Sequence, residues 1–251
     1  MRIGIDLFLR IWKTIKLDIL TNISLKIEIH LINKIPKNYL NQITMTKKID
    51  DKSVQISLTD FIEYVSKVGT TKFTKVKEIK NREPYHPAFD FWKPLREKII
   101  EIHKENKNKN LLDEVLNDLT DKNKINLYPN LISKYKSFIG RKKIEWIEPP
   151  FEDWKMNDLK IRINPEIGLF INDKPYVIKL YFKSEALSKS KVDLILLMMN
   201  ENLKKGEFTD ANFAVLDINK KKLYENCQLN KVHLSLLEGE ALSFLKIWDN
   251  V

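Results

Sequence analysis

The segment from residue 128 to residue 218 constrains the fold of this chain more than any other. Residues 176–182 (YVIKLYF) form a short apolar run typical of a buried strand, and residues 213–218 form another. Between them, apolar residues at helical spacing follow a capping residue, Ser188 or Ser190. A strand, a helix and a second strand in this order allow a crossover to a parallel neighbour. The sequence therefore predicts an α/β or α+β protein, with helices packed on a mixed sheet.

Upstream of this step the pattern indicates one helix and two strands, which precede the strand at 176–182. Leu131, Tyr135 and Phe138 share a helix face, and Gly140 suits the position after the helix end. Strands are predicted at residues 144–147, at 159–171 with an interruption at Pro165, and at 176–182. The predicted order over 128–218 is thus helix, three strands, helix, strand.

The remaining sequence divides into two further parts. Alternating apolar residues predict strands at 25–31 and 54–58, and residues 3–19 fit either a strand or a helix. A helix is expected to begin near Thr59 and to end near Gly69. We therefore expect a β-rich part with one helix at residues 1–84, followed by residues 85–251, which hold a helical bridge and the sheet core.

The helical bridge is predicted from apolar spacing. Pro94 suits the first turn of a helix, and Leu95, Ile99 and Ile102 follow at i, i+4 and i+7. A second bridge helix is expected over residues 112–119. The preceding aromatic segment, from Tyr85 to Trp92, predicts either a recognition surface or an anchor in which Phe89, Phe91 and Trp92 pack against the sheet.

Composition limits the classes of protein to which the chain can belong. No apolar stretch reaches the about 18 residues of a membrane span, so we expect no membrane partner. The single cysteine, Cys227, excludes an internal disulfide and fits a reducing compartment, which predicts a cytoplasmic location. The N-terminal residues do not resemble a secretory signal.

The chain is basic, and this favours an anionic partner. It carries 44 Lys and Arg against 34 Asp and Glu, a net charge of +10. DNA or RNA is the expected partner, although a Lys-, Asn- and Ile-rich composition also produces such a charge without function. Cations cluster after Gly69 and after Gly140, where turns can help to hold phosphate, or else form ordinary solvated faces. The predicted nucleic-acid-binding residues are Lys72, Lys75, Lys77, Arg141, Lys142, Lys143 and Lys183.

The order of elements over 128–218 resembles the core of the PD-(D/E)xK nuclease superfamily. Those enzymes place a Pro-Asp near the second strand, and an acid, a spacer and a lysine on the third. Pro165-Glu166 stands where the first acid would be, and Lys179 stands where the lysine would be. The resemblance implies a bound divalent cation such as Mg²⁺ that orients water for phosphodiester cleavage.

This sequence departs from the superfamily pattern at one acid. Val177 occupies the position two residues before Lys179. In some members the second acid lies on the following helix, where this chain offers Glu185 or Asp193, and Asp217 ends the next strand. The resemblance implies catalytic roles for Glu166, Lys179 and Asp193, and Mg²⁺ ligands at Glu166, Glu185 and Asp217. Alternatively, Lys179 on a central strand needs a carboxylate partner, and Glu166 supplies it in a structural ion pair.

Four short segments also resemble an uncharacterised bacterial protein family: GTTKFTK, FDFWKPLRE, NPEIGL and IKLYFK. This resemblance implies no function. Two hypotheses follow. The first is a nucleic-acid-associated protein of nuclease-like fold that serves DNA or RNA processing or defence against foreign DNA, either as a Mg²⁺-dependent nuclease or as a binding-only relative. The second is a non-catalytic protein-interaction subunit of a larger assembly.

Overall fold

The computed structural model describes residues 53–251, which form one compact unit. The expectations for residues 3–19 and for a strand at 25–31 lie outside the described residues. None of the helices in residues 53–251 is long and apolar enough to cross a membrane.

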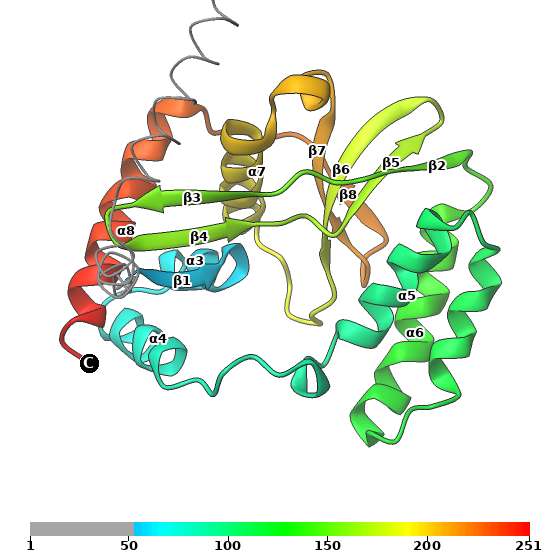
Figure 1. Cartoon of the computed structure of the whole chain (residues 1–251), viewed down its shortest axis with the longest axis horizontal. Coiled ribbons are helices and arrows are strands. Elements are labelled where there is room, and N and C mark those ends of the chain that lie inside the picture. The colour runs from blue at the N-terminus through cyan, green and yellow to red at the C-terminus, as the bar shows by residue number, and fades with distance from the viewer. Residues whose placement is uncertain (1–52) are drawn as a thin grey trace, which may run out of the picture. The chain divides into compact units, whose positions relative to one another are not determined.

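The described unit is a mixed α/β structure (Figure 1). Its α-helices are α3 (Leu58–Val65), α4 (Thr70–Lys80), α5 (Lys93–Lys104), α6 (Lys122–Ile139), α7 (Lys189–Leu203) and α8 (Leu234–Trp248). Short 3₁₀ helices cover Pro87–Phe89, Lys109–Leu116, Gly206–Phe208 and Lys231–His233. The strands are β1 (Val54–Ser57), β2 (Ile144–Ile147), β3 (Glu152–Met156), β4 (Leu159–Ile163), β5 (Ile167–Ile171), β6 (Lys174–Tyr181), β7 (Asn212–Asp217) and β8 (Lys222–Tyr224).

The larger sheet has five strands in the order β2-β5-β6-β7-β8. Strands β2, β5 and β6 form an antiparallel meander, and β8 pairs antiparallel with β7. Strand β7 runs parallel to β6, because α7 carries the chain back to the same end of the sheet. The predicted mixed sheet and the crossover to a parallel neighbour are therefore confirmed.

The smaller sheet has three strands in the order β1-β4-β3. Strands β3 and β4 form an antiparallel hairpin, and β1 pairs parallel to β4. The predicted strand over 159–171 is wrong as one element, because its two halves join different sheets on either side of Pro165. Proline lacks the N–H that a continuous ladder requires.

The pairing of β1 with β4 joins residues 53–84 to the C-terminal half of the chain. Val54 lies opposite Leu159, and α3 packs in the same core as α7 and α8. Residues 53–84 therefore belong to the same compact unit as the C-terminal half. The division into residues 1–84 and 85–251 stays a prediction, because residues 1–52 lie outside the described part of the chain. The pairing of β1 with β4 spans a long sequence separation and is invisible in local patterns.

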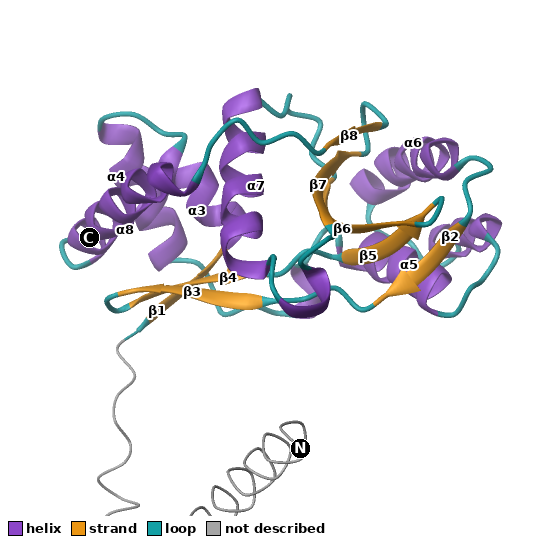
Figure 2. Cartoon of the chain, turned by 90° about the horizontal axis from the view of Figure 1, so that it is seen from above, coloured by secondary structure: helices purple, strands orange, loops and turns teal. Residues whose placement is uncertain are grey.

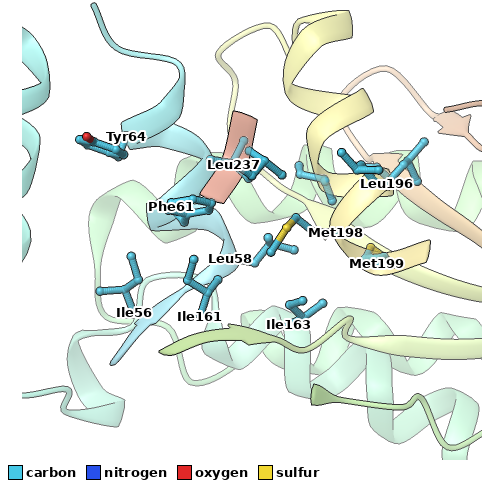
Figure 3. Packing of buried hydrophobic residues seen from close by; sticks show 14 of the residues in the cluster. Ile56, Leu58, Phe61, Tyr64, Ile161, Ile163, Leu196, Met198, Met199 and Leu237 are labelled. Carbon is cyan, nitrogen blue, oxygen red and sulfur yellow. The ribbon is translucent and has the colours of Figure 1, made fainter. Parts of the chain in front are cut away.

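The first hydrophobic core lies between the small sheet, one face of the large sheet, and helices α3, α4, α7 and α8 (Figure 3). Phe61 of α3, Ile161 of β4, Met198 of α7 and Leu237 of α8 are fully or almost fully buried in it. The helix α7 presents apolar side chains on most of its circumference, which is typical of a helix packed between two layers.

The second core covers the opposite face of the large sheet. Helices α5 and α6, with the 3₁₀ helix at 109–116, pack Ile99 and Tyr135 against Leu169, Ile178 and Leu216. Figure 2 shows α6 on one side of the strands and α7 on the other. Both faces of the central strands are therefore buried, and polar groups on β6 can persist only where they find partners.

Candidate functional site

Glu166 and Lys179 form an ion pair that links the start of β5 to the middle of β6. The Lys179 Nζ lies 2.5 Å from Glu166 Oε1, and the backbone N–H of Leu180 donates to Glu166 Oε2 at 2.7 Å. The backbone N–H of Glu166 donates to the carbonyl of Ile178 at 3.1 Å. Both oxygens of this carboxylate are therefore engaged within the sheet.

The environment of the Glu166–Lys179 pair is nearly closed. The two side chains are 13% and 12% exposed, and Lys179 also donates to the backbone carbonyl of Asn164 at 3.2 Å. Each charge neutralises the other in a region of low solvent access, so neither is presented to solvent as a free ion. The predicted structural pairing of Glu166 with Lys179 is confirmed.

The acid that the nuclease pattern requires beside this lysine is absent from β6. Val177 is completely buried in the first core. Asp193, on the first turns of α7, is also buried, but its carboxylate accepts from Lys189 at 3.0 Å and from the backbone N–H of Gln228 at 3.4 Å. Asp193 therefore fastens the segment before α8 to α7 and makes no contact with Glu166.

Of the other two candidate acids, Glu185 lies past the carboxyl end of β6, and Asp217 is the last residue of β7. Glu185 pairs with Lys191 at 3.1 Å. Asp217 is 1% exposed and accepts from the backbone N–H of Lys220 at 3.0 Å, which fixes the turn between β7 and β8. Each acid thus has a local structural role.

Tyr181 is the residue around which these acids are grouped. Its hydroxyl donates to the backbone carbonyl of Glu185 at 2.9 Å. Burial, and then the carboxylates of Glu185, Asp217 and Glu63, raise the pKa of Tyr181 to about 12. Three carboxylates therefore lie near the Tyr181 hydroxyl, and each has a lysine partner: Lys191 for Glu185, Lys220 for Asp217, and Lys183 and Lys75 for Glu63.

In the part of the chain that the structure describes, these carboxylates are not grouped as a metal site. Among residues 53–251, no group of three or more His, Cys, Asp or Glu side chains is arranged to hold a metal ion. A divalent cation usually needs several convergent oxygen ligands. The predicted ligands Glu166, Glu185 and Asp217 therefore do not fit the Mg²⁺ site that the resemblance implies.

The cations predicted on α4 are mostly used inside the protein. Lys75 is buried, 2.9 Å from the carboxylates of both Glu63 and Glu78. Lys72 pairs with Glu240 of α8. Lys77 is exposed, with no ion pair in the described part of the chain. On this helix only Lys77 among the predicted residues is free to meet an external anion.

The second predicted patch, after α6, is more open. Arg141 is exposed and has no ion pair within residues 53–251. Lys143 is shared between the carboxylates of Asp173 and Glu145, at 2.9 and 3.2 Å. Lys142 donates to the carbonyl of Phe138 and lies over that ring, so it caps the C-terminus of α6.

Lys183, predicted as a nucleic-acid contact, pairs instead with Glu63 of α3. Burial opposes ionisation of Glu63, but hydrogen bonds from Lys183 and Lys75 outweigh it and hold the pKa of Glu63 below its ordinary value. Sequence reasoning missed Glu63, because it lies more than a hundred residues before its partner and nothing local marks it.

Two cavities flank the carboxyl ends of β6 and β7. The one on the α7 side, beside Lys179 and Tyr181, has a volume of about 40 Å³. That space suits one or two water molecules and is too small for a nucleotide. The other lies on the α6 side, has a volume of about 310 Å³ and is lined by Trp92, Leu131 and Phe182 among others.

Comparison of the chain with protein-family models, with curated proteins and with solved structures finds no match.

Proposed function

We propose that this chain is a nucleic-acid-binding protein with a nuclease-like core that binds without cleaving. The order of its elements supports the core: α6, the meander of β2, β5 and β6, then α7 and the parallel strand β7. This order resembles the helix, three strands, helix and strand of the PD-(D/E)xK pattern. The hairpin of β3 and β4 is inserted between the first two strands of the meander.

The observation that carries the binding-only proposal is the Glu166–Lys179 pair. Both residues occupy the positions that the nuclease pattern gives to its first acid and its lysine, and they meet in space. Cleavage needs the carboxylate free for a cation and the lysine free for water. Here each is the partner of the other, and Val177 removes the second acid.

The charge of the chain supports nucleic acid as the partner. The net charge is +10, and Arg141 and Lys77 are exposed without an ion pair in residues 53–251. Binding that neutralises phosphates releases counterions, so its affinity falls as salt rises.

The test is fluorescence anisotropy with labelled single- and double-stranded DNA and RNA over a series of salt concentrations. We expect log Kd to rise linearly with log salt, with no product on a denaturing gel in Mg²⁺ or Mn²⁺. Arg141→Glu should weaken binding and reduce the salt slope by about 1. Lys155→Glu, which reverses an exposed charge on β3, is the matched control. Cleavage that Lys179→Ala abolishes would show an enzyme instead.

The second candidate is a protein-interaction subunit, and one feature of α8 favours it. Val232, just before α8, and Leu236 are 79% and 67% exposed, and Leu242 is also exposed. They lie with Gly239 at i, i+4, i+7 and i+10, which places them on one helix face. Absence of salt-sensitive binding to every nucleic acid tested would favour this candidate.

A further inference from the structure

The larger cavity beside β6 has a defined place in the sheet architecture. It has a volume of about 310 Å³ and lies past the carboxyl ends of the parallel strands β6 and β7, between α6 and the loop after β6. Ligands in open α/β sheets commonly bind outside the carboxyl ends of the strands. Its lining residues are Trp92, Leu127, Asn130, Leu131, Phe182, Lys183, Ser184, Glu185 and Asn219.

Parallel aromatic rings form one wall of this cavity. The rings of Trp92 and Phe182 have centroids 5.4 Å apart and planes within 13° of each other. Tyr128 continues the stack behind Trp92, with planes within 17°. Trp92 is half-buried and Phe182 is 6% exposed, so the wall offers the cavity a limited apolar ring surface in a fixed orientation, against which a planar group can pack.

The charged side chains that line this cavity form ion pairs with residues outside it. Lys183 pairs with Glu63, and Glu185 pairs with Lys191. The Asn219 amide donates to the backbone carbonyls of Phe182 and Lys183. The cavity therefore offers no free charge to a ligand.

Two neutral polar side chains at the cavity remain available. Asn130 of α6 and Ser184 of the loop make no side-chain hydrogen bond within residues 53–251, and both are exposed. An amide and a hydroxyl can donate to and accept from the polar edge of an uncharged ring.

We propose that this cavity binds an unpaired nucleobase, which rests on the proposed nucleic-acid function and specifies a single strand as its substrate class. The base packs against the aromatic wall, and Asn130 and Ser184 bind its polar edge. A base stacked in a duplex does not reach such a cavity. Tyr85 and Phe89, a few residues before Trp92, are 69% and 84% exposed and offer stacking surfaces to neighbouring bases.

The test compares labelled single-stranded DNA with the same strand carrying abasic positions throughout, by anisotropy. The abasic strand keeps the phosphates but has no base to insert. We expect the intact strand to bind about tenfold or more tightly, which is within the range of base–aromatic stacking. Free nucleosides, measured by calorimetry, test whether a base binds outside a strand.

Asn130→Trp is the variant designed to fill the cavity from the exposed surface of α6. It should remove the advantage of the intact strand and leave the abasic strand unaffected. Asn126→Trp, one turn earlier on the same helix and outside the lining residues, is the matched control and should bind as the original chain does.

The outcomes separate this inference from the function on which it rests. Equal binding of the intact and abasic strands, or unchanged preference in Asn130→Trp, would overturn the base site while leaving nucleic-acid binding in place. No salt-sensitive binding of either strand would overturn both. Binding of free nucleosides with no strand preference would assign the cavity to a free nucleoside and overturn its role in strand recognition.

Discussion

His103, in the last turn of α5, links the stability of the described unit to pH. Its Nε2 lies 2.8 Å from the Tyr135 hydroxyl, and burial lowers the pKa of His103 to about 4. In the unfolded chain this pKa is near 6.5, so the unfolded state binds more protons between these values. Neutral His103 therefore makes its full contribution to the free energy of unfolding above a pH of about 6.5, and this contribution is lost as the pH falls toward 4.

We expect the free energy of unfolding to drop by about 1–2 kcal/mol between pH 7 and pH 5 because of His103. Urea unfolding at the two pH values measures this drop. His103→Gln keeps a partner for the Tyr135 hydroxyl but does not titrate, so it should show a smaller difference. An unchanged difference in that variant would assign the pH dependence to other groups.

Gly168 is a residue at which the backbone of a neighbouring strand excludes any side chain. It lies opposite Ile147 in the β2–β5 pair, and a Cβ at this position would come within 2.4 Å of the Ile147 carbonyl oxygen. Gly168→Ala should therefore reduce the free energy of unfolding by about 1–3 kcal/mol, as overpacking does.

The control for Gly168 is Gly239, in the exposed part of α8, where an added Cβ meets no atom within 4 Å. Gly239→Ala should increase stability by up to about 1 kcal/mol, because alanine favours the helix. Thermal unfolding of both variants measures the contrast, and the same sign of change in both would contradict this account.

At the scale of elements, the Glu166–Lys179 pair joins β5 to β6. Lys179→Met leaves a carboxylate that is only 13% exposed without its cation. Loss of one partner of a buried pair costs up to about 3–5 kcal/mol. The double variant Glu166→Gln with Lys179→Met should recover part of this loss in chemical denaturation. Strictly additive losses would show that the two side chains are not coupled.

The α3–α4 pair depends on a charge network centred on Lys75. Burial opposes ionisation of Asp60, but hydrogen bonds from Arg82 and Ser57 outweigh it and lower its pKa, and the pKa of Glu63 is also lowered. A carboxyl group whose pKa is lower in the folded than in the unfolded chain stabilises the fold at pH values above its unfolded pKa, which is near 4. This stabilisation is lost as the pH falls through the folded pKa.

Lys75→Met tests the network. The variant should be destabilised at pH 7, because Glu63 loses a cation, and the difference from the original chain should narrow below about pH 4, where the acids become protonated. Thermal unfolding from pH 3 to pH 7 measures both effects. A difference that stays constant over this range would show that packing alone is responsible.

Elements with strong local signals could be predicted from the sequence, and elements defined by distant contacts could not. Pro94 and Ser188 occupy the starts of α5 and α7 as expected. The helix α4 was not predicted, because its many lysines obscure the buried Val76 and Ile79. Strand β3 (EDWKM) is polar and depends on its pairing with β4.

Of the candidate site, only the part on two neighbouring strands of the meander could be predicted from the sequence. The pairing of Glu166 with Lys179 follows from neighbouring strands. The partners of Asp193 depend on how α7 packs against its neighbours, and this is not visible in the local sequence. The contact of Glu63 with Lys183 joins segments far apart in the sequence, so it could not be predicted either. Phe91 and Trp92 anchor their segment as expected, but Phe89 does not and stays exposed.

Strand β1 has a consequence for the order in which this chain can fold. Val54 pairs with Leu159, so about a hundred residues must follow β1 before β4, its neighbour in the described sheet, has been made, and contacts this distant slow folding. On the ribosome, α3 and α4 emerge with their apolar faces uncovered until β4 and α7 have been made. The meander and the helices α5 and α6 are closer together in sequence. We therefore expect them to form the folding nucleus, against which β1, α3 and α4 pack later.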